Sequence, residues 1–413
     1  MNTTYEPVSA FTWLDYSDAE RRSMQHVIGL FREKDTRDEL GLGSVRDALS
    51  DLLLPGTSTI QTRARYFLFV PWIFQHLAAG HGPSQGNLEK KRREVETSLM
   101  TALDRGGVAA REGLIGRRTR ERTKRLPSSI YWQGLAMWGI RRWDGSIESL
   151  LRRGRTQGLD RQKTSDDGDY VASDTSIWHP ELPPRPSNLF DTTNFQLSQH
   201  EAAFLRDCIV HTVPDSMLAW LVSQGRPSDV AYLWQHPQID DFMPQHRDQL
   251  VLAERFSTLM FGASLLYGRL LTQRHPDPAR MEPLNQEWQR WFERAQPMAT
   301  GWDSGAFWSV VYRVNPRISP LTRTFVEAWI SQLCRAQQPH ELDTPAVHQL
   351  IVQRELQLKR QLARLTHEQA YALWARSVAE GWIPQQLDFR WRTAQTLLRD
   401  MLTALEHTDA EAG

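Results

Sequence analysis

Hydrophobic residues recur along most of this chain at the spacing of an α-helix. Near the N-terminus, Met24, Val27, Ile28 and Phe31 follow the i, i+3, i+4, i+7 rule and form one apolar stripe. Such a stripe predicts an amphipathic helix that needs a partner to cover it. The strict alternation typical of strands is sparse. The pattern therefore predicts a mostly α, multi-helical protein.

Capping signals fall where several of the periodic stretches begin. The capping-box pattern occurs at Ser17, Ser58, Ser198 and Thr366, each with Glu or Gln three residues later. Beyond the first helix, helices are expected at about 45–53, 59–77, 88–105, 128–140, 199–211, 216–224, 246–273, 281–295, 304–314, 321–336, 345–364, 367–379 and 390–406.

Two of these stretches carry a more specific expectation. Pro55 and Gly56 separate 45–53 from 59–77, which fits either a DNA-reading helix-turn-helix or an ordinary helical hairpin, and Pro71 should kink or interrupt the second helix. The 246–273 stretch keeps an apolar face for about seven turns. We expect it to be the central helix of the C-terminal half.

The pattern changes to Gly, Ser, Thr, Asp and Pro between residues 155 and 197. We read this segment as a linker or long loop. It divides the chain into an N-terminal helical part, 1–154, and a C-terminal helical domain, 198–413. Many of the 16 tryptophans lie in the latter, and those at Trp288, Trp291, Trp329 and Trp374 fall on apolar stripes, which favours packing over ligand stacking.

Composition restricts the compartment and the type of stabilisation. The two cysteines, Cys208 and Cys334, lie far apart within helical patterns, so neither a disulfide framework nor a zinc module is expected. The N-terminus lacks the pattern of a signal peptide, and the apolar run from Tyr66 to Phe74 is too short to span a membrane. We expect a cytoplasmic protein that does not contact a membrane.

The net charge of zero hides an uneven distribution. Residues 87–163 hold 19 basic and 9 acidic residues, whereas residues 164–413 hold 22 basic and 30 acidic ones. A basic segment suggests nucleic acid as a partner, because its side chains can contact the phosphates. Ser128 and Ser129 could add contacts at a helix start. The candidate phosphate-contacting residues are Arg111, Arg117, Arg118, Arg120, Arg122, Lys124 and Arg125, extended by Arg141 and Arg142.

The same arginines allow a second interpretation. They could pair with the acidic C-terminal part across an internal interface, or form a solvated face. Arg63 and Arg65 could join the basic surface or serve as buried partners of Asp47 or Asp51. The sequence leaves these alternatives open.

No motif for a known chemistry is evident. The phosphate loop, the dinucleotide fingerprint, the nucleophile elbow and the zinc-protease helix are all missing. The histidines lack ligand spacing, and Glu89-Lys90-Lys91, an E-x-K string of the kind found in nucleases, lies in a helical pattern. We therefore assign no catalytic residue, metal ligand or cofactor.

Several long strings resemble an uncharacterised bacterial family of unknown function: WLDYS, TRDELG, PGTSTIQTRARYFLFVPW, KRLPSSIYW and LDFRW. The resemblance covers nearly the whole chain. It implies no activity and no catalytic residues. It does suggest that members of the family accompany helicases and phospholipase-D-like proteins in anti-phage defence islands.

These observations lead to one hypothesis and two alternatives. The hypothesis is a non-enzymatic helical component of a bacterial defence or DNA-transaction system, which contacts DNA phosphates through the arginine-rich segment. The first alternative is a scaffold or adaptor for a helicase or nuclease partner. The second is a nuclease or other hydrolase whose site is assembled from distant residues.

Overall fold

The computed structural model describes residues 38–79, 88–108, 113–116, 123, 125–151, 177–274, 278–377 and 383–406. Within these ranges the chain is helical and has no strand, and one isolated antiparallel bridge joins Arg141 to Trp178. The predicted mostly α, multi-helical fold is confirmed. The amphipathic helix expected near residue 24 lies outside the described residues.

The helices follow the predicted ones closely. Those at 88–105 and 304–314 have the predicted bounds, and most others differ by a few residues at either end. The α-helices are α2 (Gly43–Leu53), α3 (Tyr66–Ala79), α4 (Leu88–Arg105), α5 (Pro127–Met137), α7 (Gln199–Thr212), α8 (Met217–Gln224), α9 (Pro244–Arg274), α10 (Pro278–Thr300), α11 (Ser304–Val314), α12 (Pro320–Arg335), α13 (Pro345–Lys359), α14 (Glu368–Ser377) and α15 (Trp391–Glu406).

The start of α3 differs from the prediction. The helix begins at Tyr66 rather than near Thr59, because Ser58 and Gln61 form a turn: the Ser58 N–H donates to Gln61 Oε1 over 3.0 Å. The helix also continues through Pro71, so of the predicted kink or interruption the interruption is wrong, and the kink stays a prediction. By contrast, the box at Ser198 is complete, with Ser198 and Glu201 bonding each other's backbone N–H groups.

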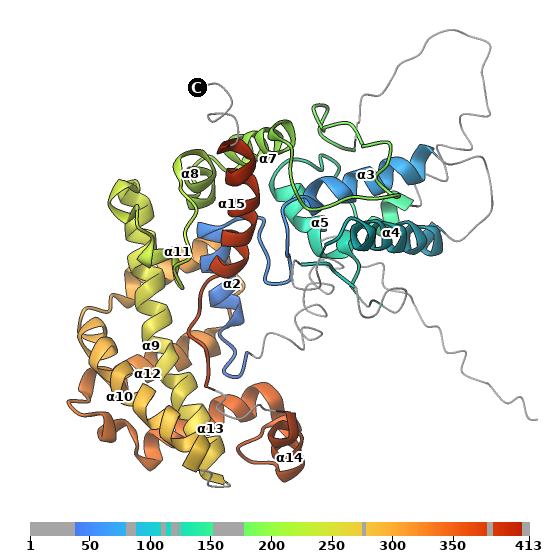
Figure 1. Cartoon of the computed structure of the whole chain (residues 1–413). Helices are drawn as coiled ribbons and strands as arrows, with labels where there is room; N and C mark the ends of the chain where they lie inside the picture. The colour runs from blue at the N-terminus through green and yellow to red at the C-terminus, as the bar shows by residue number, and fades with distance from the viewer. Residues whose placement is uncertain are drawn as a thin grey trace, which may run out of the picture.

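Helices α3, α4 and α5 form an N-terminal body, on the right of Figure 1. Its core is aromatic: the Phe67 and Trp138 rings stack with centroids 3.8 Å apart. The second half of the predicted linker, residues 177–197, is a loop that packs on this body. Its Pro183 carbonyl accepts a 2.8 Å hydrogen bond from the Trp72 indole, and its Leu189 is fully buried.

Helix α2 precedes this body in sequence but packs elsewhere. It contacts α8, α9 and α11, and Figure 1 shows it among the C-terminal helices, close to α15. The residues just before α2 are fixed to the same part, because Arg354 of α13 donates to the carbonyls of Leu40 and Gly41. Buried side chains from Leu40 to Ala404 consequently form one continuous hydrophobic core.

Helix α9 is the centre of the C-terminal part, as predicted, and packs against α10, α12 and α13. Gly262 permits the close approach of α10, since a Cβ there would lie 1.9 Å from the Trp291 ring. The Trp291 indole donates to the Thr258 carbonyl over 2.7 Å. The four tryptophans predicted to pack are all buried: Trp288, Trp291, Trp329 and Trp374.

Helix α9 is also long and apolar enough to cross a membrane by length and composition, yet 72% of its most apolar stretch is buried inside the protein. A core helix of a folded protein passes the same test. The burial of α9 is therefore explained by its packing with the neighbouring helices.

Candidate functional site

The structure places only part of the predicted basic surface. Arg125 is half-buried, Arg141 is buried and Arg142 is exposed. The other predicted phosphate-contacting residues lie outside the described residues: Arg111, Arg117, Arg118, Arg120, Arg122 and Lys124.

The described residues that border the stretch 117–122 are anchored to the N-terminal body. Gly113 accepts a 2.7 Å hydrogen bond from the Thr62 hydroxyl, and Thr123 accepts one of 2.9 Å from Arg93. Thr123 in turn donates to the Gly116 carbonyl over 3.4 Å. The described residues on either side of 117–122 are therefore fixed to the turn before α3 and to α4.

Arg141 uses its guanidinium inside the protein. It is 6% exposed, lies over the Trp132 ring at 4.7 Å, and donates to the carbonyls of Trp143 and Gly145. These groups occupy the face that a phosphate would need. The Arg141 side chain therefore stabilises the fold of the N-terminal body.

Ser128, expected as a further phosphate contact, is also bonded within the protein. Both its N–H and its hydroxyl donate to the Glu96 carboxylate, at 3.0 and 2.7 Å, and Arg92 donates to the same carboxylate over 3.0 Å. Burial raises the pKa of Glu96, while Arg92 and Ser128 oppose that rise. The beginning of α5 is thus occupied by a carboxylate of the protein itself.

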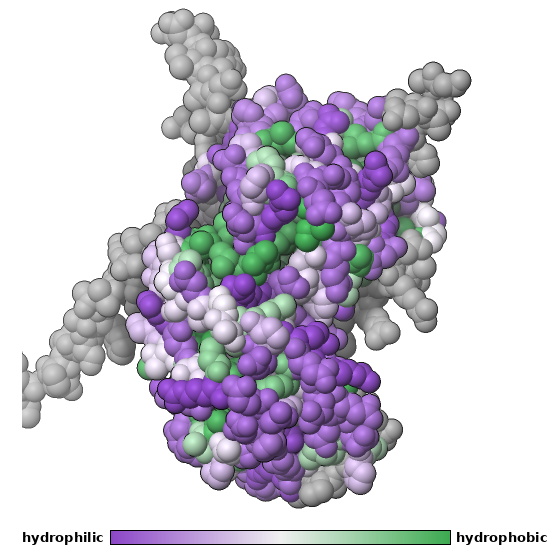
Figure 2. Space-filling model, turned by 90° about the vertical axis from the view of Figure 1, so that its left-hand side faces the viewer, coloured by the Kyte–Doolittle hydropathy of each residue, from purple (hydrophilic) through white to green (hydrophobic). Residues whose placement is uncertain are grey.

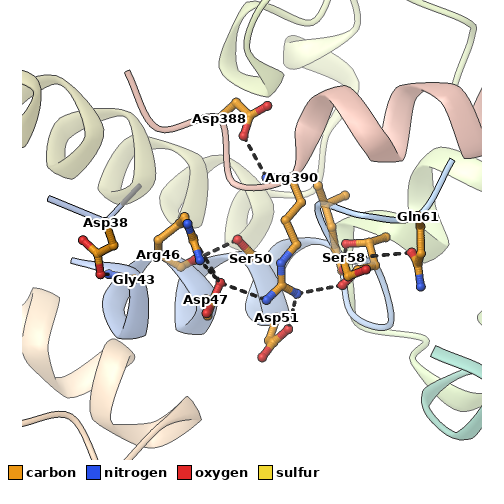
Figure 3. Close-up of polar contacts among 12 residues, drawn as sticks. Asp38, Gly43, Arg46, Asp47, Ser50, Asp51, Ser58, Gln61, Asp388 and Arg390 are labelled. Atoms are coloured by element: carbon orange, nitrogen blue, oxygen red, sulfur yellow. Dashed lines mark hydrogen bonds and ion pairs between the residues drawn. The ribbon is translucent and has the colours of Figure 1, made fainter. Parts of the chain in front are cut away.

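A set of arginine–carboxylate pairs joins segments that are distant in sequence; we call it the junction. Its centre is Arg390, which contacts Asp47 at 3.1 Å and Asp51 at 2.6 Å, and also donates to the Thr57 carbonyl (Figure 3). Arg390 lies just before α15, whereas both carboxylates lie on α2. This pairing fixes α2 to the last helix of the chain.

Two further arginines complete the junction. Arg63 pairs with Asp400 at 2.8 Å and Arg65 with Glu201 at 2.9 Å. Both are half-buried partners of carboxylates, close to one of the alternatives that the sequence left open, but the carboxylates are not Asp47 or Asp51. The acidic C-terminal part does pair with N-terminal arginines at these two positions.

Beside the junction lies a cleft of about 1010 Å³. Its walls come from the start of α2, residues 231–235, one face of α9, part of α10 and the loop 384–388. Five carboxylates and three arginines line it: Asp38, Glu39, Glu254, Glu287, Asp388, Arg46, Arg294 and Arg392. Its lining is therefore net acidic.

Most of these carboxylates already have partners. Asp38 accepts from the N–H groups of Leu42 and Gly43, both at 2.6 Å, and so caps α2. Glu39 pairs with Lys359 and Arg364. These bonds fix the rim of the cleft.

Two further carboxylates of the cleft, later in the sequence, are also paired. Glu287 pairs with Arg294 at 2.9 Å. Asp388 accepts from the backbone N–H of Arg390 at 3.1 Å. Glu254, by contrast, has no hydrogen bond or ion pair with the described residues.

An aromatic pair faces the same cleft. The rings of Tyr232 and Trp234 stack with centroids 4.7 Å apart and planes 9° from parallel. The edge of Phe389 supports Trp234, with centroids 6.2 Å apart. Phe389 and Arg390 both have positive φ, 50° and 66°, a strained conformation for residues with side chains. The surroundings therefore hold this wall in place.

Metal chemistry has no support in the part of the chain that the structure describes, where no three His, Cys, Asp or Glu residues come together as ligands. The E-x-K string lies on α4, where Glu89 pairs with Arg92 and Lys90 lies 3.9 Å from Glu94. These pairings are those of a helix surface.

Comparison with known proteins identifies the family. A model described as a family of unknown function, DUF6361, matches residues 8–404. The chain belongs to the DUF6361 family. No curated protein and no solved structure matches it.

Two of the strings that resemble a family of unknown function meet at the cleft of this DUF6361 chain. The string TRDELG supplies Asp38 and Glu39 at one wall, and LDFRW supplies Leu387 and Asp388 at another. Sequence reasoning treated both strings as signs of family membership only. Their three-dimensional meeting could not be read from their separation of about 350 positions.

Proposed function

We propose that the protein is a non-enzymatic helical component of a bacterial defence or DNA-transaction system, which contacts nucleic-acid phosphates through the basic stretch 111–125. The charge of residues 87–163, ten more basic than acidic residues, is the observation that carries the proposal. Phosphate contacts made by arginine position a nucleic acid without reading its bases.

The anchoring of the borders of this stretch supports the proposal. Gly116 and Thr123 are hydrogen-bonded to each other, and Arg93 of α4 holds Thr123. Six residues, RRTRER, lie between them. A chain segment whose two ends are fixed loses less conformational freedom on binding than a free tail does. Arg142 is exposed on the same body and extends the basic character.

The defence role rests on the resemblance of the sequence strings, which also suggests a helicase or a phospholipase-D-like protein as partner. The second candidate function, a scaffold for such a partner, is favoured by apolar surface. Figure 2 shows a patch of hydrophobic side chains on the face that lies to the left in Figure 1. The C-terminal part also exposes single leucines, Leu321, Leu362 and Leu373.

Fluorescence anisotropy of labelled single- and double-stranded DNA, titrated with the full chain across a salt series, tests the proposal. Binding should weaken steeply with salt. Replacing Arg117, Arg118, Arg120 and Arg122 by alanine should reduce the log-log slope by up to about 3.6, since each phosphate contact contributes about 0.9.

The matched control removes four arginines of the C-terminal part, the half-buried Arg206 and the exposed Arg247, Arg313 and Arg335. It lowers the total charge equally and should leave the slope nearly unchanged. Equal losses in both variants, or no binding at low salt, would overturn the proposal. Absence of binding at low salt would favour the second candidate function, a scaffold for a partner protein.

A further inference from the structure

We propose that the cleft beside the junction binds a small organic cation, an ammonium or guanidinium group on a short apolar stem, between Glu254 and the Tyr232–Trp234 pair. This site is separate from the basic stretch and does not depend on the proposed function. The ligand class follows from the groups that the cleft leaves available.

The first observation is the size and lining of the cleft. Its volume of about 1010 Å³ lies at the upper end of the range for ligand sites in proteins. Its walls combine apolar groups, such as Phe261 and Met298, with a few polar ones. This mixture is typical of a site for a small molecule.

The second observation is the availability of one carboxylate. Asp38, Glu39, Glu287 and Asp388 are bonded to the protein, whereas Glu254 makes no hydrogen bond or ion pair with any residue described. Its neighbour Arg255 donates to the Gly301 carbonyl over 2.6 Å. No described cation lies within ion-pair distance of Glu254, and a ligand can supply one.

The electrostatics of Glu254 agree with this reading. Burial raises the pKa of its carboxyl group, and Arg255 only partly offsets the rise. A bound cation would favour the ionised form and lower that pKa again. The attraction is stronger in a half-buried cleft than in bulk water, because the effective dielectric constant is lower.

The third observation is the aromatic wall. Electron-rich ring faces attract cations, with tryptophan the most effective. Tyr232 and Trp234 are stacked, and Phe389, in its strained conformation, supports Trp234 from the side. The wall is thus built before a ligand arrives, which reduces the ordering that binding requires.

Charge also decides which ligands the cleft rejects. Five carboxylates and three arginines line it, so its formal charge is negative. A phosphate or a nucleic-acid backbone would meet net repulsion there. The cleft and the basic stretch therefore select ligands of opposite charge.

Isothermal titration calorimetry of the full chain tests the proposal with two cationic probes. Agmatine represents a free diamine-like metabolite, and N-acetyl-arginine amide represents the side chain of a partner protein. We expect saturable binding of at least one probe with a Kd on the order of 1 mM or tighter. Preference for agmatine indicates a metabolite, and preference for the blocked arginine indicates a partner.

Two substitutions and a control connect binding to the cleft. Glu254→Gln should weaken binding about tenfold or more, and Trp234→Ala should weaken it as well. Glu293→Gln removes an exposed carboxylate of α10 outside the cleft and should have no effect. Circular dichroism and thermal unfolding establish that each variant is folded.

Three results would overturn the proposal. One is the absence of saturable binding of either probe to the wild-type chain. Another is unchanged affinity in the folded Glu254→Gln variant. The third is displacement of the bound probe by inorganic phosphate at constant ionic strength, because an anion should not compete for a cation site.

Discussion

The junction and the cleft share the same elements, α2 and the loop before α15, yet their charged side chains differ in whether they are paired. In the junction every arginine described has a carboxylate within 3.1 Å. In the cleft, a few residues away, Glu254 has no such partner among the residues described. A paired charge serves the fold, whereas an unpaired charge in a half-buried cleft is available for binding. Substitutions in the two places should therefore have different effects on stability.

The largest effect is expected at the centre of the junction. Arg390→Ala removes the cation that joins Asp47 and Asp51 to the loop before α15, and Asp47 then keeps only its pairing with Arg46 on α2. Breaking a buried pair from one side costs about 3 kcal/mol of the free energy of unfolding. Urea unfolding followed by circular dichroism measures it.

Arg392→Ala is the matched control, since Arg392 is exposed and lies on the cleft side of the same segment. Its loss should change the free energy of unfolding by less than about 0.5 kcal/mol. Similar losses in both variants would remove the distinction between junction and cleft.

The next effect depends on pH. Burial raises the pKa of Glu39, but Lys359 and Arg364 more than compensate, and the net result is a pKa below the ordinary 4.5. A carboxyl with a lowered folded-state pKa stabilises the fold above its ordinary pKa, and this contribution is lost as the pH falls through the lowered value.

The variant Glu39→Gln should accordingly lose about 2 kcal/mol at pH 7. Its stability should then approach that of the wild type as the pH falls below the ordinary value of 4.5 and through the lowered pKa of Glu39. Urea midpoints at several pH values measure this convergence. A constant difference over the whole range would mean that Glu39 is not stabilised by its two cations.

The smallest effect is expected in the cleft. Burial raises the pKa of Glu254, so its ionised form is disfavoured in the folded state, and stability should rise as the pH falls through that raised pKa. Glu254→Gln should therefore change the free energy of unfolding at pH 7 by no more than about 0.5 kcal/mol, in the stabilising direction. A large loss in thermal or urea unfolding would reveal a structural partner for Glu254.

Much of the fold could be predicted from local pattern. The helix at 304–314 was predictable to the residue, because Asp303 caps it and its Phe307 and Val311 repeat at helical spacing. The start of α3 was not. The N–H groups of Thr62 and Arg63 bond to the hydroxyl of Tyr131, a partner almost 70 positions away that no local pattern reveals.

The candidate sites were less predictable for the same reason. The basic stretch was visible because charge density is a local property of sequence. The pairing of Arg63 with Asp400 spans 337 positions, and the cleft joins five separate segments. Tyr232 and Trp234 lie in a segment with no helical periodicity, so no local pattern singles them out.

The position of α2 has a consequence for the synthesis of the protein. This helix and the residues before it are buried against α8, α9, α11 and α13, and are held by Arg390. At translation rates of about 5 to 20 residues per second, roughly 20 to 70 seconds separate the appearance of α2 from that of Arg390. Until α8, α9 and α11 have also been synthesised, the apolar face of α2, with Val45, Leu49 and Leu53, lacks its native partners, and the nascent chain offers a binding site for chaperones.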